Sequence, residues 1–135
     1  MGQRRYNLSF AELVDRLCLV QMKQNYGGDY VEEMKDVLYD IDLLIREGIV
    51  VVSADMIRAI TVMVQANVEI WINEDMERRG LLEENPDWEF KYKNLLRTHK
   101  LNSTRSEAKA RVQELIGGRS DKKLNYHNGE WKISW

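Results

Sequence analysis

The chain has 135 residues, of which 31% are charged, with one proline, one cysteine and a formal net charge of −2 at pH 7. This length predicts a single domain over residues 1–135, and the composition is typical of a mainly helical soluble protein. No apolar run approaches the roughly 18 residues of a transmembrane helix, and the start lacks the apolar core of a signal peptide, so no membrane partner is expected. A lone cysteine excludes an internal disulfide and indicates a reducing compartment, which predicts a cytoplasmic protein.

Two amphipathic helices are predicted in the first third of the chain. Ser9-Phe10-Ala11-Glu12 is a capping box, so a helix is predicted over residues 9–24. Asp29, with a glutamate three residues on, predicts a second helix over residues 29–46, which Gly48 ends. Apolar side chains recur in the second helix at helical spacing, and we expect them to face inward. They are Val31, Met34, Leu38, Ile41 and Ile45.

A third helix is predicted over residues 53–79, and it is apolar nearly all round between Met56 and Ile72. Such a helix is expected to be surrounded by the rest of its domain. One line along it nevertheless carries Asn67 and Glu74 beside core side chains. These polar groups need partners from other helices. The polar stripe of this helix is narrow and consists of Arg58, Thr61, Gln65 and Glu69.

The rest of the chain predicts a fourth helix and a hairpin. Asn85-Pro86 places a cap and then a proline at the start of a helix over residues 86–116. Asn128-Gly129 lies between two alternating segments and predicts a β-hairpin over about residues 122–135. A lone hairpin is marginal in water, so it is expected to dock on its own bundle or on a second subunit, as in a homodimer. The predicted fold is mainly α, a four-helix bundle-like domain with a C-terminal β-hairpin.

Charge is distributed unevenly along the chain. Up to Asn85 there are 9 Lys and Arg against 16 Asp and Glu, a net charge of −7, and from Pro86 onward there are 11 against 6, a net charge of +5. This split predicts that the two parts face each other, and the alternative is that the basic part binds phosphate. Nucleic acid is not an expected partner, because the chain is acidic overall and has no concentrated basic face.

Polar residues on the inward faces of three predicted helices define a candidate site. An arginine there grips phosphate or carboxylate with two parallel hydrogen bonds, and a tryptophan stacks on a base or sugar. One interpretation is therefore a pocket for a small anionic ligand such as a nucleotide or nucleotide sugar. The alternatives are a salt-bridge network that fixes helix register and, for the tryptophan, plain core packing. No catalytic residue is assigned. The candidate ligand-binding residues are Asp15, Lys23, Asn67, Trp71, Glu74, Asp75, Asn102, Arg105 and Lys109.

Three motifs in these helices resemble those of a family of small, uncharacterised bacterial and tailed-phage proteins. They are Leu13-Val14-Asp15-Arg16-Leu17 with Lys23, the stretch 67–75 with Asn67, Trp71 and Glu74-Asp75, and Leu101-Asn102 with Arg105 and Lys109. The resemblance covers most of the first, third and fourth predicted helices and does not cover the second. Bacterial members tend to accompany glycosyltransferase-type genes, which implies a nucleotide sugar, and a phage member would act in the host cytoplasm. The family implies no activity.

Two other functions are left open. Glu12-x-x-Asp15 and Glu33-x-x-Asp36 match the paired motifs with which an all-α nucleotide pyrophosphatase holds Mg²⁺. Only a nucleotide hydrolase of this kind would need a cofactor. The second alternative is an interaction protein that binds or blocks a host protein through the hairpin aromatics and the acidic face of the second helix. His99, His127 and Cys18 are too few and too scattered to predict a zinc site.

Overall fold

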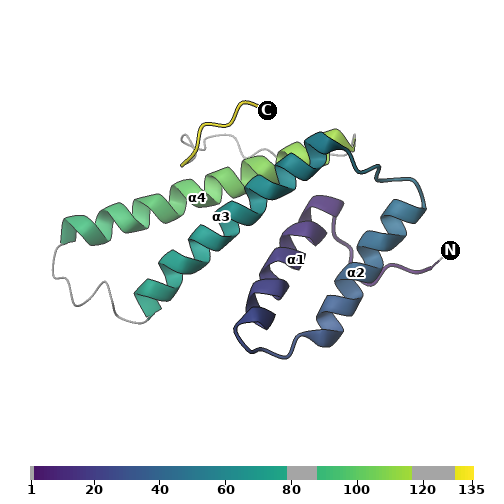
Figure 1. Cartoon of the computed structure of the whole chain (residues 1–135), viewed down its shortest axis with the longest axis horizontal. Helices are drawn as coiled ribbons and strands as arrows, with labels where there is room; N and C mark the ends of the chain where they lie inside the picture. The colour runs from purple at the N-terminus through teal and green to yellow at the C-terminus, as the bar shows by residue number, and fades with distance from the viewer. Residues whose placement is uncertain (1, 79–87, 117–129) are drawn as a thin grey trace.

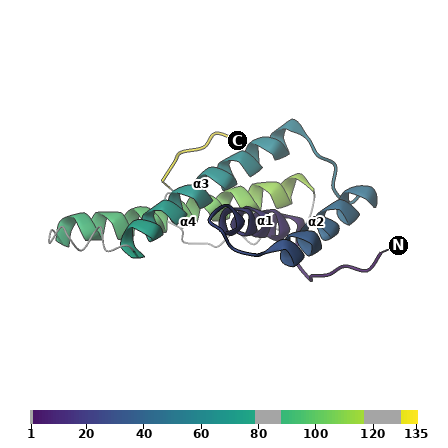
Figure 2. The same cartoon turned by 60° about the horizontal axis from the view of Figure 1, so that its bottom comes forward.

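The computed structural model describes residues 2–78, 88–116 and 130–135. Within these ranges the chain folds into four helices and no strand: α1 (Phe10–Asn25), α2 (Val31–Arg46), α3 (Ala54–Arg78) and α4 (Trp88–Leu115). α3 and α4 are long and run side by side in opposite directions, and α1 and α2 form a shorter pair beside them (Figure 1; Figure 2). The predicted mainly helical fold is confirmed. None of the helices described combines the length and the apolar character needed to cross a bilayer.

Local sequence explains where the helices begin and end. Ser9 Oγ accepts a hydrogen bond from the Glu12 backbone N–H at 3.2 Å, and the Glu12 carboxylate accepts one from the Ser9 N–H at 3.0 Å, which completes the capping box. Ser53 Oγ accepts a hydrogen bond from the Met56 backbone N–H, in the first turn of α3, at 3.2 Å. Gly48, with φ of 74°, ends α2 in the left-handed conformation that glycine adopts most readily. The predicted cap of α2 is shifted, because Tyr30 and not Asp29 occupies the N-cap position.

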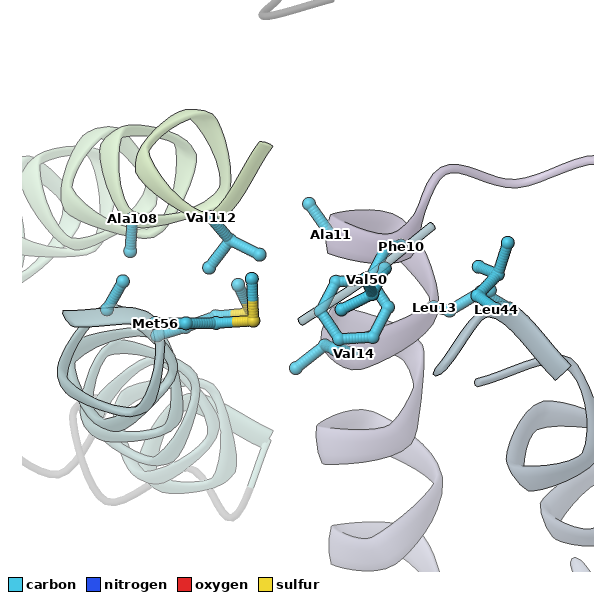
Figure 3. Packing of buried hydrophobic residues seen from close by; sticks show 11 residues of the cluster. Phe10, Ala11, Leu13, Val14, Leu44, Val50, Met56, Ala108 and Val112 are labelled. Atoms are coloured by element: carbon cyan, nitrogen blue, oxygen red, sulfur yellow. The ribbon is translucent and has the colours of Figure 1, made fainter. Parts of the chain in front are cut away.

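The hydrophobic core lies where the N-terminal half of α1 meets the other three helices. Met56 of α3 and Val112 of α4 are fully buried and face the Phe10 side of α1 (Figure 3). On its other side α1 places Leu13 toward Leu44 of α2 (Figure 3). α1 is therefore the central helix, packed between α2 and the α3–α4 pair.

α2 packs on α1 and makes no helix–helix contact with α3 or α4 in the described part of the chain. Its buried face carries Val37, Asp40 and Leu44. The prediction that Val31, Leu38 and Ile45 face inward is wrong, because these three side chains are exposed. A single neighbouring helix covers only a narrow arc of α2, so the rest of its apolar side stays in contact with solvent.

The prediction that α3 is surrounded by its own domain is also wrong. Ile57, Val64, Val68 and Ile72 are 56%, 40%, 38% and 43% exposed. α3 contacts only α1 and α4 among the described helices, and both lie on its other sides. The helix therefore presents an apolar row to solvent along most of its length.

The structure does not support the predicted β-hairpin. Residues 130–135 are irregular, and the first strand of the prediction, with the Asn128-Gly129 turn, lies outside the described residues. The C-terminal segment contacts its own helices. The Glu130 backbone N–H donates to the Lys100 carbonyl at 3.2 Å, and Trp135 Nε1 donates to Glu107 Oε1 at 2.9 Å. Trp135 also packs on the hydrophobic core.

Candidate functional site

Asp15 is the centre of a polar cluster that joins α1, α3 and α4. This residue is 4% exposed, and its Oδ1 accepts hydrogen bonds from Asn67 Nδ2 and from Arg105 Nε, each at 2.9 Å. Arg105 Nη2 donates to Oδ2, so the guanidinium grips the carboxylate with two parallel hydrogen bonds. Lys109 Nζ lies 3.6 Å from the same Oδ2. These four residues are called the Asp15 cluster below.

The contacts in the Asp15 cluster favour the ionised forms of Asp15 and Arg105. Burial by itself raises the pKa of the Asp15 carboxyl, but hydrogen bonds from Arg105 and Asn67 and the charges of Arg105 and Lys109 outweigh it and lower that pKa. The hydrogen bond to Asp15 raises the pKa of the Arg105 guanidinium in turn. Two cations therefore share one buried carboxylate. The exposed Glu74 carboxylate also acts on Arg105 through its charge.

The cations of the Asp15 cluster reach the protein surface. The Arg105 and Lys109 side chains are 26% and 32% exposed, whereas that of Asp15 is nearly covered. Arg105 donates to Asp15 through Nε and Nη2, so the ion pair with Asp15 does not use Nη1. The Lys109 ammonium carries three donors and touches the carboxylate at the outer limit of an ion pair. The exposed parts of Arg105 and Lys109 therefore lie at the solvent side of the cluster.

Cys18 lies one turn after Asp15 on α1 and was not predicted to belong near the cluster. Burial, and then the negative charge of Asp15, raise the pKa of its thiol to about 11. A thiol with such a pKa stays protonated at neutral pH and is a poor nucleophile. Cys18 is therefore a partly buried, protonated thiol beside the Asp15 cluster.

The remaining predicted residues lie around the Asp15 cluster at different places. Trp71 stacks on Tyr26, with ring centroids 5.5 Å apart and an interplanar angle of 16°. Lys23 is exposed and places its ammonium 5.5 Å from the centroid of the Tyr30 ring, so the structure does not bring it to Asp15. Asn102 is half-buried one turn before Arg105, and Asp75 is half-buried one turn after Trp71.

A second polar network, absent from the sequence-based prediction, surrounds Arg97 of α4. Its Nη2 donates to Glu69 at 3.1 Å, its Nη1 to Asn73 Oδ1 at 3.4 Å, and its Nε to Glu130 at 3.3 Å. Asn73 is buried, and its Nδ2 has no hydrogen-bond partner. The i, i+4 spacing of Glu69 and Asn73 was the available signal, but Glu69 was assigned to the outer stripe of α3. The network ties the C-terminal segment to α3 and α4.

The acidic and basic parts of the chain meet only partly. Asp15 and Glu69 bind cations of α4, as the charge split predicts. Three of the five acids of α2 instead pair with α1 or with the segment before it, and the other two pair within α2. Glu33 lies 3.2 Å from Arg16, and the carboxylate of Asp40 accepts the backbone N–H groups of residues 5 and 6 at 2.7 and 2.8 Å.

The four carboxylates of the magnesium hypothesis are engaged separately. Glu12 caps α1, Asp15 holds Arg105, Glu33 pairs with Arg16, and Asp36 lies 3.8 Å from Arg5. Within residues 2–78, 88–116 and 130–135 no three potential metal ligands lie close enough together to hold one ion. The structure therefore gives this hypothesis no geometric support.

No family model, curated protein or solved structure matches this chain.

Proposed function

We propose that the chain binds a small anionic ligand at the solvent side of the Asp15 cluster. The observation that carries the proposal is that Arg105 and Lys109 share the single buried carboxylate of Asp15 and both remain partly exposed. Asp15 fixes the direction of the guanidinium before any ligand arrives. A pre-oriented cation loses less conformational freedom on binding, which favours affinity.

The ligand class that fits best carries phosphate or carboxylate oxygens beside a ring. The Tyr26–Trp71 stack places an aromatic pair one helical turn after Asn67 on α3, and Tyr26 is well exposed. Aromatic side chains of this kind stack on bases and sugars. A nucleotide or nucleotide sugar combines both features, and the motif resemblance to bacterial and phage proteins favours the same class. The proposal includes a cytoplasmic setting, supported by the single cysteine.

A thermal-shift series tests this proposal. The ligands are pyrophosphate, nucleoside diphosphates and nucleotide sugars, with and without Mg²⁺, and sodium sulfate at equal ionic strength is the reference. Lys109→Met removes one cation of the cluster, and Lys93→Met is the matched control, because Lys93 is an exposed α4 lysine whose partner is Glu89 at 3.1 Å.

A ligand at a hundredfold excess over its Kd adds about 2.7 kcal/mol to the free energy of unfolding, which raises Tm by several degrees. We expect such a shift in the wild type and in Lys93→Met, and its loss in Lys109→Met. The proposal fails if no compound exceeds the sulfate reference, or if Lys109→Met responds like the wild type.

A second candidate function, binding to another protein, is supported by the outer face of α4. Trp88, Tyr92 and Leu95 are 79%, 65% and 53% exposed and follow one another at helical spacing, with exposed Leu96 beside them. The first 13 residues of α4 contain four Lys and Arg against one acid, a net charge of +3. An aromatic row in a basic setting fits an acidic protein surface. The test compares the binding of a partner protein by two variants. Binding should be lost in Tyr92→Ser/Leu95→Ser and retained in Lys109→Met.

A further inference from the structure

The solvent-facing side of α3 carries a row of five residues with little polar character. The row is Ile57, Thr61, Val64, Val68 and Ile72. Their spacing of three or four residues places them on one face of the helix. Residues 59–68 include no charged side chain, so nothing in the middle of α3 interrupts this face. A helix that only bounds a domain normally has charged residues on its outer side.

We propose that this outer row of α3 is the contact surface between two copies of the chain. The other exposed apolar rows lie on charged helices: α2 has five acids against two bases, a net charge of −3, and the first part of α4 has a net charge of +3. Pairing either of these with itself brings like charges together, which opposes association. α3 as a whole also has a net charge of −3, but its charged residues all lie outside residues 59–68. The middle of the outer row therefore meets no like charge when α3 pairs with its own copy, which makes α3 the helix best suited to do so.

The charge profile of α3 sets the direction of pairing. Residues 54–66 contain one acid and one base, whereas residues 67–78 contain four acids and one arginine, a net charge of −3. A parallel pair would place the two acidic halves together, and an antiparallel pair separates them. In the antiparallel arrangement Thr61 faces Val68 of the partner subunit, and Val64 lies beside the two-fold axis. The row spans 16 residues, a rise of roughly 22 Å along the helix.

The exposed apolar area of the outer row bears on how tightly two copies bind. The apolar members of the row expose roughly 300 Å² per copy. This is less than the roughly 800 Å² on each side of a standard interface. The area therefore predicts a reversible dimer.

Sedimentation equilibrium of the full chain tests the proposal. The protein concentrations run from about 5 to about 500 µM, which covers the dissociation constants expected of a weak dimer. The wild type is expected to dimerise, and Val64→Asp is expected to raise the dissociation constant about a hundredfold, because two carboxylates then meet at the axis. Leu38→Asp on α2 and Leu95→Asp on α4 are matched exposed controls and should leave the constant unchanged. Helical circular dichroism checks that each variant is folded. A monomeric wild type, or a dimer lost in a control variant and retained in Val64→Asp, overturns the proposal.

Cysteine cross-linking tests the direction without depending on the charge variant. Thr61→Cys and Val68→Cys are each oxidised alone and then as a mixture, with the wild type and its Cys18 as the reference. Antiparallel pairing predicts a covalent dimer in the mixture and almost none in either variant alone. A dimer in each variant alone contradicts the antiparallel arrangement, and no dimer in any sample contradicts the α3 interface.

Discussion

Removing the Asp15 carboxylate is the sharpest test of how α1 is held against α3 and α4. Asp15→Leu leaves Arg105, Lys109 and the Asn67 amide without their shared acceptor. Breaking a buried ion pair by removing one partner costs about 3–5 kcal/mol when the remaining charge stays buried. Because Arg105 and Lys109 are partly exposed and can regain water, we expect a loss of about 2–3 kcal/mol in the free energy of unfolding.

Urea denaturation at pH 7 measures this loss, and a thermal melt should show a Tm lower by about 10 °C for a chain of this size. Asp15→Asn keeps the volume and one acceptor, so about half of the loss is expected. Glu32→Gln is the control, because Glu32 is an exposed acid paired with Lys35 at 3.3 Å and should change the free energy of unfolding by less than about 0.5 kcal/mol. If Asp15→Leu is no more destabilising than Glu32→Gln, the Asp15 cluster does not hold the three helices together.

Three further results are expected. The pKa values of Asp15 and Asp40 are lowered in the folded chain, so the stability that their carboxylates contribute is complete above their ordinary pKa of 3.8. This stability is lost as the pH falls through the lower pKa values of the folded chain. Urea denaturation midpoints measured from pH 7 to 2.5 should therefore drop in that acid range, and less steeply in Asp15→Asn. Because the pKa of the Cys18 thiol is about 11, a thiol reagent at pH 7.5 should label it roughly 300-fold more slowly than free cysteine, and rapid labelling of the native protein would contradict its burial. Arg97→Met removes the side-chain contact to Glu130, so limited proteolysis should cut the C-terminal segment faster than in the wild type. An unchanged rate would mean that Trp135 and the Glu130 backbone hydrogen bond hold the segment without Arg97.

The features of the fold that depend only on residues close together in the sequence were predictable. The capping box at Ser9, the cap at Ser53 and the glycine after α2 are local signals, and each has a local physical cause. What the sequence did not predict is how far each helix is covered. Val31, Leu38 and Ile45 were assigned inward because they form an apolar face, yet α1 is the only described helix that packs on α2, and it covers a different arc. An apolar face shows that burial is favourable and does not show that a neighbour is present.

The candidate site was predictable to the extent that buried polar groups require partners. Asp15, Asn67, Arg105 and Lys109 lie on helix sectors that also carry core residues, and the structure brings these four together. Lys23 lies elsewhere, because a long side chain near a helix end can point to several neighbours, and here it lies over Tyr30. The Arg97 network needed the path of the C-terminal segment, which periodicity alone does not provide. Binding of a ligand at the Asp15 cluster stays a prediction.

The measurement that tests the central claim most directly is a nuclear magnetic resonance titration of arginine side chains with pyrophosphate. Arg105 and Arg97 are matched reporters: both are on α4, and both donate through Nε to a carboxylate. Anion binding at the Asp15 cluster predicts a saturable shift of the Arg105 Nε–H signal, with the Arg97 signal unchanged. Equal and non-saturating shifts of both signals, or no shift of Arg105, would contradict the account.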